Sequence, residues 1–108
     1  MGIDVLNHIC GNTTGALDHI AGLDADAFSL DFKVDLVVAR EKLSDRMALI
    51  GNIEPSLLLT AESSEIEALS REAVTKARQK GFVLSPGCDV PLESPIENVK
   101  RLIDVAGE

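Results

Sequence analysis

Short runs of apolar residues alternate along the chain with longer segments in which apolar residues recur every three or four positions. The short runs have the length of buried strands and end in small or polar residues. They cover residues 5–10, 27–30, 47–50 and 82–85. Since each run precedes a segment with helical spacing, the pattern predicts a strand followed by a helix, four times in succession.

The expected helices begin and end at residues typical of helix boundaries. We expect them over residues 13–22, 35–43, 64–81 and 95–106, with an extra turn after Pro55. The second helix is expected to bury Val34, Val37 and Val38. The buried side of the last helix is expected to carry Ile96, Val99, Ile103 and Ala106.

Strict alternation of strands and helices is typical of a parallel sheet with right-handed crossovers. The sequence therefore predicts an α/β fold, with residues 1–108 as one domain. Four such units form either a small open sheet or half of an eight-stranded barrel. Half a barrel leaves two unpaired strand edges and an uncovered inner face. We therefore expect the missing half in the same polypeptide, in a second copy or in another chain.

Composition sets limits on compartment and partners. The chain has 108 residues, 45% of them hydrophobic, which suits one domain with a modest core. It has neither an apolar run of roughly 18 residues nor the pattern of a signal peptide, so we expect a cytoplasmic protein. There the two cysteines stay reduced, which favours metal binding or catalysis over a disulfide. The net charge of −8, with scattered basic residues, disfavours nucleic acid as a partner.

Three residues at strand ends have the chemistry of metal ligands. His8 and Cys10 are two positions apart in the first expected strand, so they share one face. Cys88 follows the fourth strand. Carboxyl ends of parallel strands meet at one rim, and three His/Cys donors with one open position are typical of catalytic zinc. Each residue taken alone is more often an ordinary packing residue.

Two further polar residues lie at the same expected rim. Asp31 ends the second strand and Asn52 follows the third. Either residue could line a pocket for a substrate or cofactor. Aspartate and asparagine at such junctions are also common turn and loop formers. Asp89 also has two possible roles, since it could support a bound ligand or lie in a solvated turn.

Four motifs in order give the chain a resemblance to a known family. The motifs are His8-Ile9-Cys10-Gly11-Asn12-Thr13, Ser29-Leu30-Asp31, Ala48-Leu49-Ile50-Gly51-Asn52 and Leu84-Ser85-Pro86-Gly87-Cys88-Asp89. They resemble the C-terminal half of the uroporphyrinogen decarboxylase superfamily, most closely the methylcobalamin:coenzyme M methyltransferases. Phe32 departs from the pattern, because an acidic residue is common there in these methyltransferases.

The resemblance implies the last four units of a (βα)8 TIM barrel, with zinc bound by His8, Cys10 and Cys88 as the catalytic residues. It also implies methylcobalamin, carried by a partner corrinoid protein, as methyl donor and a thiol such as coenzyme M as acceptor, a reaction of methanogenesis. Asp31 and Asn52 are the candidates for contact with the cofactor. The decarboxylases proper lack this pair of cysteines.

Three hypotheses follow. The chain is a zinc-dependent methyltransferase or the C-terminal half of one, a decarboxylase of the porphyrinogen type, or a non-catalytic subunit that completes a barrel with a partner.

Overall fold

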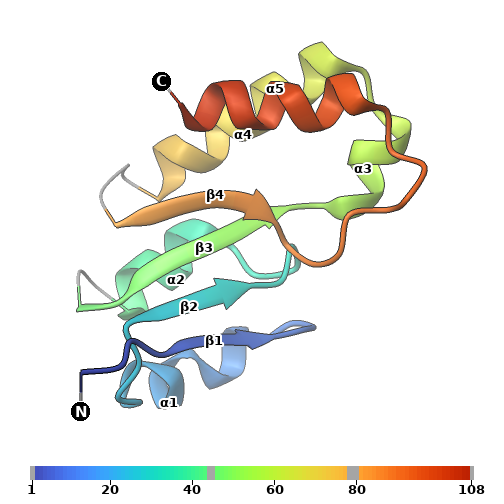
Figure 1. Ribbon diagram of the computed structural model, residues 1–108. Coiled ribbons are helices and arrows are strands. Elements are labelled where there is room, and N and C mark those ends of the chain that lie inside the picture. The colour runs from blue at the N-terminus through green and yellow to red at the C-terminus, as the bar shows by residue number, and fades with distance from the viewer. Residues whose placement is uncertain (1, 44–45, 78–80, 108) are drawn as a thin grey trace.

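The structure is a computed structural model that describes residues 2–43, 46–77 and 81–107. Four parallel strands form one sheet in the order β1-β2-β3-β4 (Figure 1). The strands are β1 (Leu6–Ile9), β2 (Ala27–Leu30), β3 (Ala48–Ile53) and β4 (Phe82–Pro86). The helices are α1 (Leu17–Ala21), preceded by the 3₁₀ helix η1 (Thr14–Ala16), α2 (Leu36–Leu43), α3 (Pro55–Thr60), α4 (Ser63–Lys76) and α5 (Ile96–Ala106).

The helices cover one face of the sheet. On that face Phe28, Leu30 and Leu49 are fully buried, as expected for side chains between strands and helices. On the opposite face, Leu6 of β1 is 57% exposed and Val83 of β4 is 54% exposed. Parallel strands in chain order with helices on one side form part of a (βα)n barrel, since a doubly wound sheet reverses its strand order and is covered on both faces. The predicted fold class is confirmed.

Both outer strands of this sheet have a free edge. Among the described residues, β1 pairs only with β2, and β4 pairs only with β3. Their backbone groups on the outer side are therefore available to further strands. The third strand is longer than expected, because Gly51–Ile53 continues the ladder opposite Leu84–Pro86.

The predicted buried side of α2 is wrong in part. Val37 is 39% exposed, whereas Leu36, Ala39, Arg40 and Leu43 are buried. The Arg40 guanidinium donates hydrogen bonds to the carbonyl of Ala77 at 2.9 Å and to that of Gly81 at 3.2 Å. These bonds turn the Arg40 side of the helix toward the end of α4.

The prediction for α5 is wrong for three of its four residues. Ile96, Ile103 and Ala106 are exposed and Val99 is half-buried, whereas the buried residues are Asn98, Leu102 and Val105. The Asn98 amide donates to the carbonyls of Leu58 and Ala61, at 2.8 and 2.9 Å. A buried amide with two acceptors fixes the orientation of the helix and leaves a second apolar stripe facing solvent. None of the helices in the described segments is both long and apolar enough to cross a membrane.

Candidate metal centre

His8, Cys10 and Cys88 converge at the carboxyl end of the sheet. One donor atom from each residue lies within 4.8 Å of the others, and all three side chains are exposed. The His8 Nε2 atom lies 3.2 Å from the Cys10 sulfur, and the two sulfurs are 3.8 Å apart. Because Ile9 alternates with them along the chain, His8 and Cys10 can present their donors together. The convergence expected from the sequence is therefore present in the geometry.

Cys88 reaches this group although β1 and β4 lie at opposite edges of the sheet. Three strand spacings separate those edges, about 14 Å. The segment after β4 bends over the strand ends toward β1 and passes beside the β2–α2 loop (Figure 1). There the Gly87 amide donates to the Ile53 carbonyl at 2.8 Å, and its α-carbon packs against Phe32. The path of this loop brings Cys88 to Cys10.

The spacing of the two sulfurs fits a tetrahedral zinc site. Two sulfurs bound at about 2.3 Å in tetrahedral geometry lie about 3.8 Å apart, and the Cys10 and Cys88 sulfurs are 3.8 Å apart. Sulfur and nitrogen ligands of the same ion lie about 3.6 Å apart. The 3.2 Å between His8 and Cys10 is shorter, so these two side chains have to separate slightly to admit the ion. The exposure of all three residues leaves access for an external ligand.

Charge at the site favours a dication. The hydrogen bond to Cys88 and the negative charge that its thiolate would carry raise the pKa of the Cys10 thiol, and Asp31 and Asp89 act in the same direction. Two adjacent thiolates are therefore unfavourable without a compensating positive charge. A bound divalent metal removes the repulsion between the thiolates and reverses the direction in which the pKa of the Cys10 thiol is shifted.

Asp31 supports the segment that follows Cys10. Its carboxylate accepts hydrogen bonds from the backbone amides of Gly11 and Lys33, each at 2.9 Å. The Gly11 bond is the main reason that the pKa of Asp31 is lowered from its usual value, and the side chain is only 5% exposed. An ionised acceptor in this position ties the end of β1 to the loop after β2. Its predicted contact with a cofactor stays a prediction.

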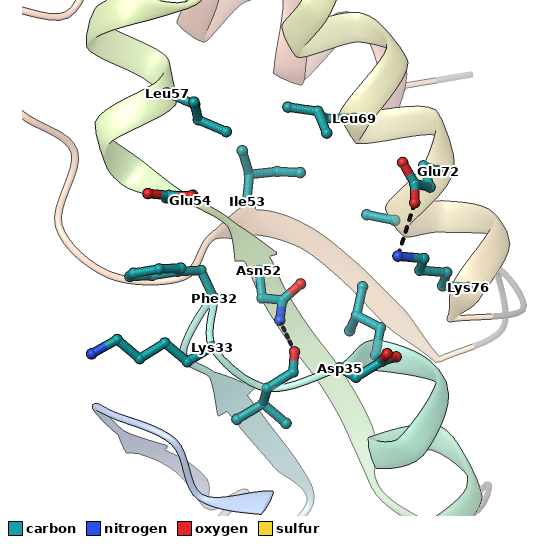
Figure 2. A pocket seen from close by; sticks show the side chains of 13 residues that line it. Phe32, Lys33, Asp35, Asn52, Ile53, Glu54, Leu57, Leu69, Glu72 and Lys76 are labelled. Atoms are coloured by element: carbon teal, nitrogen blue, oxygen red, sulfur yellow. Dashed lines mark hydrogen bonds and ion pairs between the residues drawn. The ribbon is translucent and has the colours of Figure 1, made fainter.

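Asn52 lies in a different environment, a pocket of about 380 Å³ on the helical side of β3 (Figure 2). Its amide donates to the carbonyls of Asp31 and Val34, at 3.0 and 2.6 Å, so it holds the β2–α2 loop. Figure 2 shows Glu72 and Lys76 across the pocket, joined by an ion pair of 2.8 Å. That pair raises the pKa of Lys76. Asn52 was expected in the loop after the third strand but lies within β3, and its expected backbone hydrogen bonds are present. Cofactor binding stays a prediction.

Ser29 is a neighbour of the donor group to which sequence reasoning gave no role. Its hydroxyl oxygen lies 2.8 Å from the Nδ1 atom of His8. The two residues are register partners on β1 and β2, with side chains on the helix-free face. Ser29 belongs to one of the four sequence motifs. The sequence does not give the register between β1 and β2 that places Ser29 beside His8.

Comparison with known proteins identifies the family. The sequence profile described as uroporphyrinogen decarboxylase (URO-D) matches residues 1–108. The chain belongs to the uroporphyrinogen decarboxylase family. This membership confirms the family resemblance carried by the four sequence motifs.

Relatives in this family include both kinds of enzyme that the motifs suggested. A uroporphyrinogen decarboxylase of Coxiella burnetii is 36% identical over 92 residues, which cover 82% of this chain and 24% of the relative. A methylcobamide:CoM methyltransferase of Methanosarcina acetivorans is 32% identical over 100 residues, which cover 92% of this chain and 28% of the relative. The chain thus spans about a quarter of the length of these relatives.

A solved structure shares the fold of this URO-D family member. A methyltransferase from Methanosarcina mazei superposes with a TM-score of 0.86 and 29% sequence identity. The match covers 98% of this chain and 31% of the methyltransferase chain. Nearly all of the described architecture therefore corresponds to part of a larger methyltransferase.

Proposed function

We propose that this chain is part of a zinc-dependent methyltransferase that transfers a methyl group from a methylated corrinoid to a thiol such as coenzyme M. One observation carries the proposal, namely the convergence of His8, Cys10 and Cys88 with a spacing that suits tetrahedral zinc. The methyltransferase relative and the methyltransferase structure support the same reading.

The three side chains would hold zinc and leave its fourth position to the thiol substrate. Two thiolates and a neutral imidazole balance the charge of the dication. When bound, zinc lowers the pKa of a coordinated thiol, so that its sulfur is available as a nucleophile at neutral pH.

Methyl transfer then exchanges one bond for another. The thiol loses its proton to solvent, and its sulfur attacks the methyl carbon. A sulfur–carbon bond forms as the cobalt–carbon bond breaks, and the electron pair of the broken bond stays with the corrinoid. Exposure of all three donors at the rim leaves room for a corrinoid to approach on a partner protein.

The remaining wall of the substrate pocket would come from further βα units. The free edges of β1 and β4 and the exposed face around Leu6 and Val83 are the surfaces that such units would cover. The chain corresponds to 31% of the solved methyltransferase, which supports completion by additional chain, by a second copy or by a partner.

The decarboxylase relatives support a second candidate function, the decarboxylation of a porphyrinogen. Decarboxylation of a porphyrinogen needs no pair of thiolates at the rim. A site built from two cysteines and a histidine therefore favours methyl transfer. Turnover of a porphyrinogen by the metal-free protein would reverse this preference.

Metal analysis tests the proposal directly. We expect about one zinc per complete site, with sulfur neighbours at about 2.3 Å and a nitrogen neighbour at about 2.0–2.1 Å in the zinc-edge absorption spectrum. Replacement of Cys88 by serine, or of His8 by alanine, should sharply lower the zinc content. His19 is exposed on α1 and provides the matched control, because His19→Ala should retain zinc.

The thiol-binding step can be tested without a corrinoid. Addition of coenzyme M to the zinc-loaded protein should raise the number of sulfur neighbours from two to three. An unchanged zinc spectrum contradicts the proposed acceptor site, and unchanged zinc content in Cys88→Ser contradicts the metal site itself.

A further inference from the structure

The imidazole of His8 has a hydrogen-bonding partner on each ring nitrogen. Its Nε2 atom faces the Cys10 sulfur at 3.2 Å, and that sulfur lies 3.8 Å from the sulfur of Cys88. Its Nδ1 atom faces the Ser29 hydroxyl at 2.8 Å. The metal-binding side and the supporting side of the ring are therefore distinct.

We propose that Ser29 is a positioning residue that holds His8 in the tautomer able to bind metal through Nε2. This inference rests on the proposed zinc site and assigns a role to a residue outside the three donors.

To bind a metal, the His8 ring must direct a nitrogen lone pair toward it. A metal close to both cysteine sulfurs can only be reached by Nε2, since Nδ1 points to Ser29. The Nε2 lone pair must then be free, so the proton of the neutral ring must be on Nδ1. Ser29 Oγ is placed to accept a hydrogen bond from that Nδ1–H group. In histidine ligands, the partner of the second nitrogen sets the tautomer and the ring orientation.

The backbone fixes Ser29 in this role. Ser29 lies between Phe28 and Leu30, whose side chains are fully buried on the helical face. Alternation along β2 therefore directs the serine to the face that carries His8. Parallel pairing of His8 with Ser29 brings the two side chains to the same level. A hydroxyl on a strand paired on both sides is better positioned than one on a loop, because its backbone has little freedom.

Zinc affinity provides the first test. We expect Ser29→Ala to weaken zinc binding about 10- to 100-fold, the usual effect of removing the partner of a histidine ligand. Ser29→Thr keeps the hydroxyl and should restore most of the affinity. Ser85→Ala is the matched control, because Ser85 is a strand serine whose hydroxyl donates to the Pro86 carbonyl and should not affect the ring. Affinities are measured by competition with a chromophoric chelator, and circular dichroism checks that each variant is folded.

Nitrogen NMR of the histidine ring gives a readout that a general loss of stability would not mimic. In the metal-free wild type near pH 8, Nδ1 of His8 should give the signal of a protonated nitrogen and Nε2 that of an unprotonated one. In Ser29→Ala the proton should shift toward Nε2, and in Ser29→Thr it should stay on Nδ1.

The outcomes separate this inference from the proposed function. Equal zinc affinity and unchanged ring signals in Ser29→Ala overturn the role of Ser29 while leaving the zinc site intact. If the wild type takes up no zinc, the proposed function fails, and the ring signals of the metal-free protein still decide whether Ser29 sets the tautomer.

Discussion

Gly87 lies against the backbone of Phe32 so closely that no larger residue fits without movement. A Cβ atom at position 87 would sit 2.5 Å from the amide nitrogen of Phe32 and 3.1 Å from its α-carbon. This contact joins the loop after β4 to the loop after β2, next to the residue that supplies the third donor. The absence of a side chain at Gly87 is therefore what allows Cys88 to approach Cys10.

Replacement of Gly87 by alanine should displace this loop and weaken zinc binding. Overpacking against backbone costs about 1–3 kcal/mol, and it moves Cys88 away from the other two donors. We expect about a 5- to 150-fold loss of zinc affinity, because 1.4 kcal/mol corresponds to a factor of ten. Gly15→Ala is the control, since a Cβ at Gly15 meets nothing within 4 Å. Equal affinity in both variants would show that the loop adapts freely.

Asp31 makes the stability of the metal-free protein depend on pH in the acid range. Its pKa is lowered in the folded chain, above all by the Gly11 amide, whereas in the unfolded chain it is about 3.9. As the pH falls, the unfolded chain takes up this proton first. The contribution is therefore present above about pH 4 and is lost below it, as the pH approaches the folded-state pKa.

Asp31→Asn should consequently lower the free energy of unfolding near neutral pH and flatten its acid dependence. The loss is expected to be about 1–3 kcal/mol, as for hydrogen bonds to a charged group. Urea unfolding of the zinc-free protein at several pH values measures this loss in the free energy of unfolding. Asp104→Asn, at an exposed site on α5, serves as the control. A constant difference between wild type and Asp31→Asn across the acid range would contradict the assignment.

Arg40 stabilises the packing of α2 on the end of α4. Its side chain is 3% exposed and donates to the carbonyls of Ala77 and Gly81. Arg40→Met keeps much of the volume and should cost about 1–3 kcal/mol for each carbonyl that loses its donor. In Arg101→Met the loss should stay below about 1 kcal/mol, because Arg101 is exposed and pairs with Glu67 at 3.7 Å. Chemical denaturation compares the two, and equal losses would contradict a special role for Arg40.

The uncovered face of the sheet should make the isolated chain associate. Val83 is 54% exposed on that face, and within the described part of the chain both outer strands have a free edge. Val83→Lys places a charge there and should reduce association in sedimentation velocity. Val37→Lys introduces the same change on the outer side of α2 and should have little effect. A monodisperse wild-type monomer would contradict the proposed need for further βα units.

The sequence was enough to predict the order of strands and helices. It was also enough to predict that His8 and Cys10 share one face of a strand. Both depend on short-range periodicity, since a strand repeats every two residues and a helix every 3.6. The same reasoning failed for the buried sides of α2 and α5. There the orientation depends on Arg40 and Asn98, polar residues whose partners lie 37 to 41 residues away along the chain. No local pattern contains those partners.

The amino-acid sequence by itself determined the alternation of strands and helices, the family, and the three residues with metal-binding chemistry. Only the tertiary structure decided that the Cys10 and Cys88 sulfurs, 78 positions apart, lie 3.8 Å from each other and that Ser29 faces His8. The physical reason is that strand register and loop path arise from packing between distant segments. The close contact of Gly87 with Phe32, which brings the last donor into place, joins two loops that are far apart along the chain.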